Sequence, residues 1–230
     1  MLEVSAMLHF AENELQIVAL TFMAVVYAIK VRWILKFPAG GDRQAPFGSE
    51  HTSSRKGGLL SLFQISMPWA MASTRRHPWL YAQFVIFHVG VAVAIAMSFF
   101  IPYAPGIIAG RAAVIALQAI FAGAMLAGLA RFVRRVSDPY MRAISTPDDY
   151  FSIALLLVWL GSSFLAAPNL PQNGERWLIA YFVLTAFFLI YVPFSKISHY
   201  IYYPFARWYL GKTLGHRGVY PLRTPRVTQT

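Results

Sequence analysis

Five long apolar blocks set the strongest constraint on how this chain of 230 residues can fold. The blocks run over Leu15–Leu35, Trp79–Ile101, Ala112–Ala130, Tyr150–Ala167 and Trp177–Ile201. A helix of roughly 20 apolar residues spans a hydrocarbon core of about 30 Å. Only 13% of the residues are charged, whereas ordinary soluble domains have about 25%. The sequence therefore predicts an all-α integral membrane protein, a bundle of five transmembrane helices.

The basic residues lie almost entirely between and after these blocks on one side of the predicted membrane. Segments 30–78, 131–149 and 196–230 contain 18 of the 20 Lys and Arg residues. By the positive-inside rule this side is cytoplasmic, so we expect the N-terminus outside and the C-terminus in the cytoplasm of a multi-pass inner-membrane protein. The formal charge of +11 then reflects topology and attraction to anionic membrane lipids. No basic segment interleaves aromatic residues, and we expect no nucleic-acid partner.

The remaining segments divide the chain into three parts. Residues 1–14 form an outer segment, whose acidic sequence MLEVSAMLHFAENE does not resemble a cleaved signal peptide. Residues 15–209 hold the membrane domain, with a Gly-rich polar loop at 36–78 that we expect to be largely mobile without a partner. Residues 210–230 form a cytoplasmic tail. The stretch STPDDY at 145–150 has a Ser/Thr cap, an early proline and two acids, which predicts a helix start.

Two of the six histidines, His88 and His199, lie inside apolar blocks. At about 1.5 Å per residue, His88 is roughly 14 Å inside its helix and His199 is roughly 12 Å before Arg207 at the basic end of the last block. The two rings are thus expected at similar depth on antiparallel helices, an arrangement that suits a b-type haem. A proton or ion pathway, or helix packing through hydrogen bonds, are the alternatives.

The other four histidines have simpler interpretations. His9 and His51 are expected in solvent, His77 at the level of the lipid headgroups, and His216 in the exposed tail. The chain has no cysteine, which excludes disulfides, iron–sulfur ligation and covalent attachment of a c-type haem.

Two short motifs resemble the cytochrome b (gamma) subunit family of respiratory nitrate reductase. They are FHVG at Phe87–Gly90 and PFSKISH at Pro193–His199. The stretch SDPYMRAISTPDDYF is similar to the branch of that family found in heterodisulfide-reductase-like and dissimilatory sulfite-reduction complexes. The family pattern has two haems, but here the ligand positions of the second, outer haem hold Ser98 and Tyr181. The resemblance therefore implies a single haem.

This resemblance implies a membrane-anchoring electron-transfer subunit. His88 and His199 would bind one non-covalent haem b on the cytoplasmic side, and electrons would pass between the quinone pool and a cytoplasmic iron–sulfur subunit. The chain would not be catalytic alone, except for quinone or quinol redox chemistry. Pro193 is expected to kink the fifth helix before His199, and five cations are candidates to bind the propionates: Arg75, Arg76, Arg131, Arg134 and Lys196. The alternative is a haem-free anchor, or a transporter-like subunit.

Overall fold

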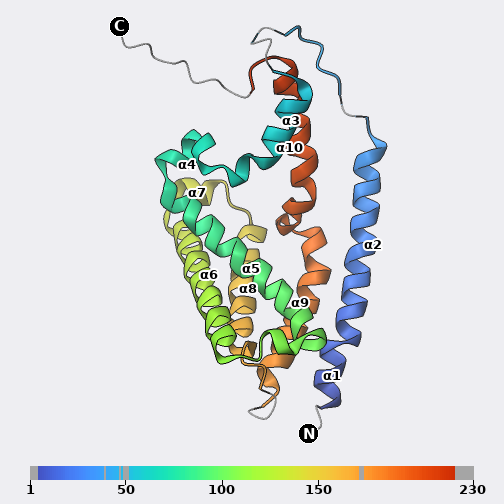
Figure 1. Ribbon diagram of the computed structural model, residues 1–230, viewed down its shortest axis with the longest axis vertical. Coiled ribbons are helices and arrows are strands. Elements are labelled where there is room, and N and C mark those ends of the chain that lie inside the picture. The colour runs from blue at the N-terminus through green and yellow to red at the C-terminus, as the bar shows by residue number, and fades with distance from the viewer. Residues whose placement is uncertain (1–4, 39, 47, 49–51, 171–173, 221–230) are drawn as a thin grey trace. The chain divides into compact units, whose positions relative to one another are not determined.

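The computed structural model describes residues 5–38, 40–46, 48, 52–170 and 174–220 (Figure 1). These residues form helices and connecting turns, with no β-strand among them. Five helical segments are long and apolar enough to cross a membrane: Ala6–Lys36, Pro78–Tyr103, Arg111–Ser137, Pro147–Ala166 and Arg176–Phe194. The prediction of an all-α chain is confirmed, and these five helices support the prediction of a multi-pass membrane protein.

The fourth span shows how the local sequence sets a helix end. Helix α8, Pro147–Ala166, begins at the predicted place, with Thr146 as its N-cap and Pro147 at its first position. The Asp149 carboxylate accepts a hydrogen bond from the Thr146 backbone N–H at 2.8 Å, which is half of a capping box. The predicted helix start in STPDDY is confirmed.

The fifth span ends earlier than the apolar block indicates. Helix α9, Arg176–Tyr191, is followed by two 3₁₀ turns, η5 at Val192–Phe194 and η6 at Lys196–Ser198. Helix α10, His199–His216, then begins anew. The expected kink at Pro193 is a complete break of the α-helix, because proline has no N–H to donate and its ring clashes with the preceding turn.

The chain divides into two compact units, which are described separately below. Unit 1 contains Met1–Ala28 and Trp79–Ser198, and unit 2 contains Ile29–Pro78 and His199–Thr230. The boundary between Ser198 and His199 coincides with the start of α10.

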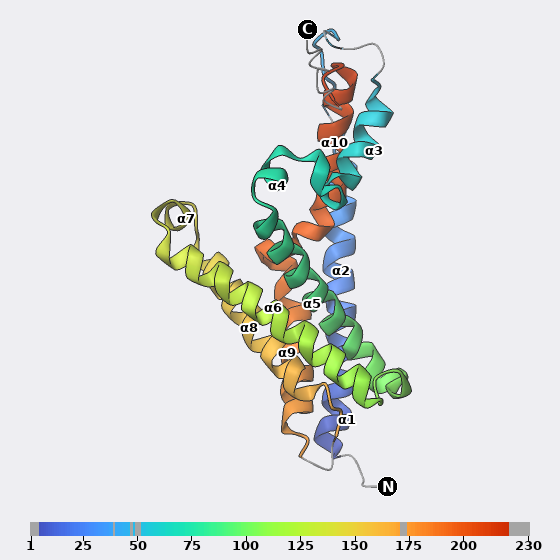
Figure 2. The same cartoon turned by 60° about the vertical axis from the view of Figure 1, so that its left-hand side comes forward.

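Unit 1 is built on three helices that pack side by side. Helix α6, Arg111–Ser137, packs on α8, which follows it after the short helix α7, Pro139–Ala143, and α8 packs on α9 (Figures 1 and 2). The helix α1, Ala6–Glu12, also contacts α9. The largest fully buried side chains of this unit are Phe121, Leu160, Tyr181, Phe182, Leu8 and Met97.

The second span, α5 at Pro78–Tyr103, approaches α6 closely at one small residue. Gly90 is buried, and a Cβ placed on it would lie only 2.2 Å from the Cβ of Ala124. Gly128, one turn further along α6, faces the ring of Phe87, which would be 2.8 Å from an added Cβ. The glycine of the FHVG motif therefore permits helix packing rather than making room for a ligand.

Unit 2 contains a helix pair that the sequence does not predict. Helix α3, Ser54–Phe63, lies in the loop expected to be mobile, yet it packs along α10 (Figure 2). The two backbones almost touch, because an added Cβ on Gly57 would lie 2.2 Å from the Gly211 carbonyl oxygen and 2.8 Å from the Gly215 Cα. Small residues at such an interface allow close helix packing.

Side-chain hydrogen bonds connect α10 and the residue after it to α3 and to the segments on either side of α3. Arg207 of α10 donates to the Ser61 carbonyl oxygen at 3.2 Å and to the Gln64 side chain at 2.6 Å. Arg217, just beyond α10, binds the Asp42 carboxylate at 2.5 Å. α10 continues through residues 210–216, so the first part of the expected tail is helical and packed.

Candidate functional site

His88 lies in the middle of α5 with its orientation fixed by its own helix. Its Nδ1 is 2.7 Å from the carbonyl oxygen of Phe84, one turn earlier. A carbonyl oxygen can only accept, so Nδ1 carries the proton in this contact and the lone pair of the neutral ring is on Nε2. The ring packs against those of Phe84 and Phe87, with centroid distances of 4.2 and 5.9 Å.

His199 is the first residue of α10 and is exposed. Its ring lies 6.4 Å from that of Tyr200. His88 belongs to unit 1 and His199 to unit 2, so the expected pairing of the two rings stays a prediction. His199 and Arg207 both lie in α10, so the helix that the depth estimate assumes between them is present.

The remaining histidines are exposed wherever the structure describes them. These are His9, His77 and His216, whereas His51 lies outside the described residues. His9 is 3.4 Å from Glu14, and His216 is the last residue of α10.

The two positions of the outer haem in the family pattern are filled with packed side chains. Tyr181 is fully buried, and its hydroxyl donates to the Ala94 carbonyl oxygen at 2.6 Å. Its ring is stacked near that of Trp159 at 6.5 Å, and Trp159 donates to Thr185 at 2.9 Å. Ser98 binds the backbone of its own helix, donating to the Ile95 carbonyl oxygen at 2.7 Å. The hydroxyls of Tyr181 and Ser98 thus both donate to backbone carbonyl oxygens of α5.

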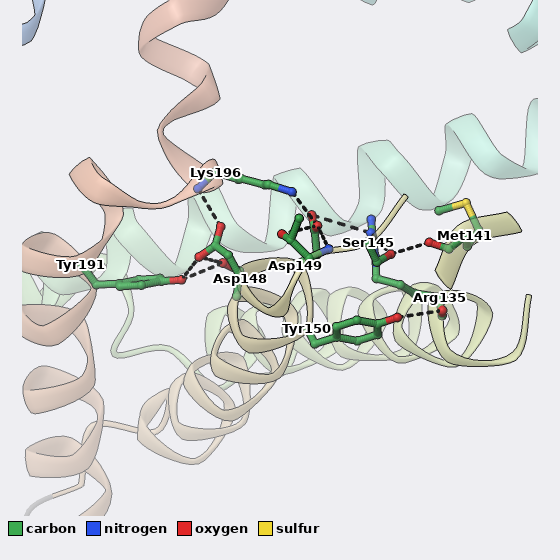
Figure 3. A network of polar contacts seen from close by, with 10 residues as sticks. Arg135, Met141, Ser145, Asp148, Asp149, Tyr150, Tyr191 and Lys196 are labelled. Atoms are coloured by element: carbon green, nitrogen blue, oxygen red, sulfur yellow. Dashed lines mark hydrogen bonds and ion pairs between the residues drawn. The ribbon is translucent and has the colours of Figure 1, made fainter. Parts of the chain in front are cut away.

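A polar network at the start of α8 joins two motifs that are distant in sequence (Figure 3). One Asp148 oxygen accepts a hydrogen bond from the Tyr191 hydroxyl, at the end of α9. The other accepts from the backbone N–H of Lys196 in η6, at 3.0 Å. The carboxylate thus holds the chain on both sides of the helix break.

Asp149 extends the network to a third helix. Its carboxylate is 2.6 Å from the Lys196 ammonium and 3.7 Å from the Arg135 guanidinium of α6. Arg135 also donates to Ser145 at 2.6 Å (Figure 3). Lys196 is therefore paired within the protein and is a poorer candidate for a haem propionate than the sequence suggests.

This network is the main feature that the sequence did not predict. Both aspartates lie at the positive end of the α8 dipole, as the sequence predicts, and both also bind Lys196. Charged side chains near lipid tend to pair. The two acids at the edge of an apolar block and the lysine of the PFSKISH motif are therefore the sequence features that could have predicted this network.

No group of three or more His, Cys, Asp or Glu side chains is placed to hold a metal ion within the part of the chain that the structure describes. A haem iron needs only two protein ligands, so the geometry of larger clusters does not bear on it.

Comparison with known proteins identifies one informative similarity. A protein of Nitratidesulfovibrio vulgaris (strain Hildenborough), described only as "Protein", is 26% identical over 168 residues, which cover 68% of this chain and 70% of that protein. No family model matches the chain, and no solved structure matches it significantly. These comparisons establish similarity to a protein whose description states no activity.

Proposed function

We propose that the chain is a membrane-anchoring haem b subunit of a respiratory redox complex, which passes electrons between the quinone pool and a cytoplasmic iron–sulfur partner. The observation that carries this proposal is the His88 contact. A donor bond from Nδ1 to a backbone carbonyl fixes ring orientation and tautomer in metal-ligating histidines. In α5 this contact would make Nε2 the atom of His88 that binds iron.

His88 and His199 would hold the haem as its two axial ligands. When bound, the haem supplies a reversible one-electron redox centre. The Phe84 carbonyl orients His88, and the packed Tyr181 region supports one haem per chain rather than two.

Arg131 is the best candidate among the five cations for a propionate. It is half-buried near the end of α6, with its guanidinium carbon 6.0 Å from the centre of the Phe87 ring. Within the described residues it has no carboxylate partner. A half-buried cation is stabilised by an anion, and a propionate carboxylate is one such group.

The distribution of charge supports the proposed orientation. Unit 1 has seven Lys and Arg and seven acidic residues, whereas unit 2 has 13 basic and two acidic residues. Unit 1 is therefore neutral overall, and the formal charge of +11 comes entirely from unit 2. Such a concentration supports a cytoplasmic position for unit 2 by the positive-inside rule, and tags at the two chain ends should report opposite sides of the membrane.

Three alanine variants of the full chain test the function. In purified membranes, His88→Ala and His199→Ala should each lose most of a reducible b-type absorption band, while His77→Ala should keep it. Acid acetone should extract the haem, since no cysteine can attach it, at about one per chain as only two histidines are proposed as ligands. A wild-type chain without any b-type band would contradict the proposal and favour the haem-free anchor.

A further inference from the structure

The backbone of the helix break before His199 needs a partner from another helix. Pro193 has no N–H. Three amides of the break bind within it: Ser195 donates to the Val192 carbonyl oxygen at 3.1 Å, Ser198 to the Ser195 carbonyl oxygen at 3.2 Å, and Ile197 to the Ser195 hydroxyl at 3.2 Å. The Lys196 amide instead donates to Asp148 of α8 at 3.0 Å. Thus one backbone group of η6 depends on a side chain 48 residues earlier.

Asp148 is well suited to fix this segment because its two oxygens bind opposite ends of the break. One oxygen binds the last side chain of α9, Tyr191, and the other binds η6 (Figure 3). Ser152, one turn further along α8, is 3.0 Å from the Tyr191 hydroxyl and supports that end. Hydrogen bonds to a carboxylate are stronger than those between neutral groups.

We propose that Asp148 is a positioning residue for His199. His199 follows the clamped Lys196 by three residues and begins α10. The hydrogen bond to the Lys196 amide therefore constrains the backbone that leads directly into His199. This inference rests on the proposed haem ligation and adds to it a residue that does not touch the haem.

If Asp148 contributes only to the stability of the fold, a different experimental result is expected. If Asp148 only joined α8 to α9, its loss would destabilise unit 1 without changing the coordination of iron. Asp149 offers a matched control, because it is the next residue, carries the same charge and also binds Lys196, but through the flexible side chain rather than the backbone. Replacing either aspartate removes one negative charge from the same helical turn.

The experiment compares Asp148→Ala, Asp149→Ala and Asp148→Asn in the full-length, detergent-purified protein. The readouts are haem bound per chain and the fraction of ferric haem with the low-spin spectrum of two histidine ligands, by electron paramagnetic resonance. Asp148→Ala should lower the low-spin fraction or the haem affinity by about tenfold, as expected for the loss of hydrogen bonds to a charged group. Asp148→Asn should restore much of it, because the amide oxygen still accepts from Lys196.

The outcomes separate the inference from the proposed function. A normal low-spin spectrum in Asp148→Ala, or equal losses in the two alanine variants, would overturn the positioning role while leaving haem binding intact. If Asp148→Ala does not fold, Tyr191→Phe, which removes one end of the clamp, takes its place and should change the spectrum in the same direction. A wild-type protein without haem would instead refute the proposed function itself.

Discussion

Gly90 of α5 and Gly123 of α6 form a natural pair for testing how these two helices pack. Both are helical glycines in the same pair of neighbouring helices. An alanine Cβ at Gly90 would lie 2.2 Å from the Cβ of Ala124, whereas one at Gly123 would find its nearest neighbour, the Ile86 Cγ2, at 3.6 Å. Carbon atoms pack at about 3.5–4.0 Å, so only the Gly90 substitution forces the helices apart, by about 1.3–1.8 Å.

The expected change in the free energy of unfolding is the balance of two opposing effects. Glycine to alanine favours any helix by about 0.8–1.0 kcal/mol, and this gain is common to both variants. Overpacking a close contact costs about 1–3 kcal/mol, and this cost applies to Gly90 alone. Gly90→Ala should therefore be about 1–3 kcal/mol less stable than Gly123→Ala, and Gly123→Ala should be at least as stable as the wild type.

Equilibrium unfolding in lipid bicelles measures both free energies under one condition. The difference between the two variants cancels the helix-propensity term and isolates the contact. If Gly90→Ala proved as stable as Gly123→Ala, α5 and α6 would not meet at Gly90, and the interpretation of the FHVG glycine as a packing residue would be refuted.

Three further predictions test the packed interior, the helix pair of unit 2 and its response to pH. Tyr181→Phe should lower the free energy of unfolding by about 0.5–1.5 kcal/mol through loss of one buried hydrogen bond; unchanged stability would contradict the packing role. Gly57→Ala should separate α3 from the α10 backbone, so that trypsin cleaves within α3 faster than in the wild type, and unchanged cleavage would argue against the helix pair. Hydrogen bonds from Arg217 hold the pKa of the Asp42 carboxyl below its ordinary value, so the contact stabilises the fold above pH about 4 and is lost as the pH falls through the lower folded-state pKa. A fluorophore on Gly41→Cys, the only thiol in the variant chain, should report this acid transition, and adding Asp42→Asn should abolish it.

The membrane spans are predictable from sequence because lipid imposes a simple rule of length and apolarity. The first four predicted blocks lie within observed helices to a few residues. The fifth is predicted too long, to Ile201, because the apolar run continues through a helix break. Hydropathy measures transfer to lipid and not backbone geometry, so Pro193 indicated a kink but not the two 3₁₀ turns that place His199 at the start of a new helix.

The candidate site is predictable only where one residue carries the signal. An ionisable ring in an apolar block identifies His88 at once. The Asp148 clamp and the α3–α10 pair escape prediction because their partners are distant in sequence and their residues have sufficient local explanations. Two aspartates at a helix start suit the helix dipole, and the glycines of α3 indicate flexibility until the backbone of α10 is placed against them.

The pairing of α3 with α10 has a consequence for the order in which the protein is made. Arg207 and its acceptor Ser61 are 146 residues apart, so at 5–20 residues per second α3 leaves the ribosome about 7–30 s before its partner exists. During that interval four of the five spans must insert while α3 has no helix to cover its glycine face. A chain stopped after α9 would keep all five spans and never bury α3, so membrane insertion and completion of unit 2 are separate events in its biogenesis.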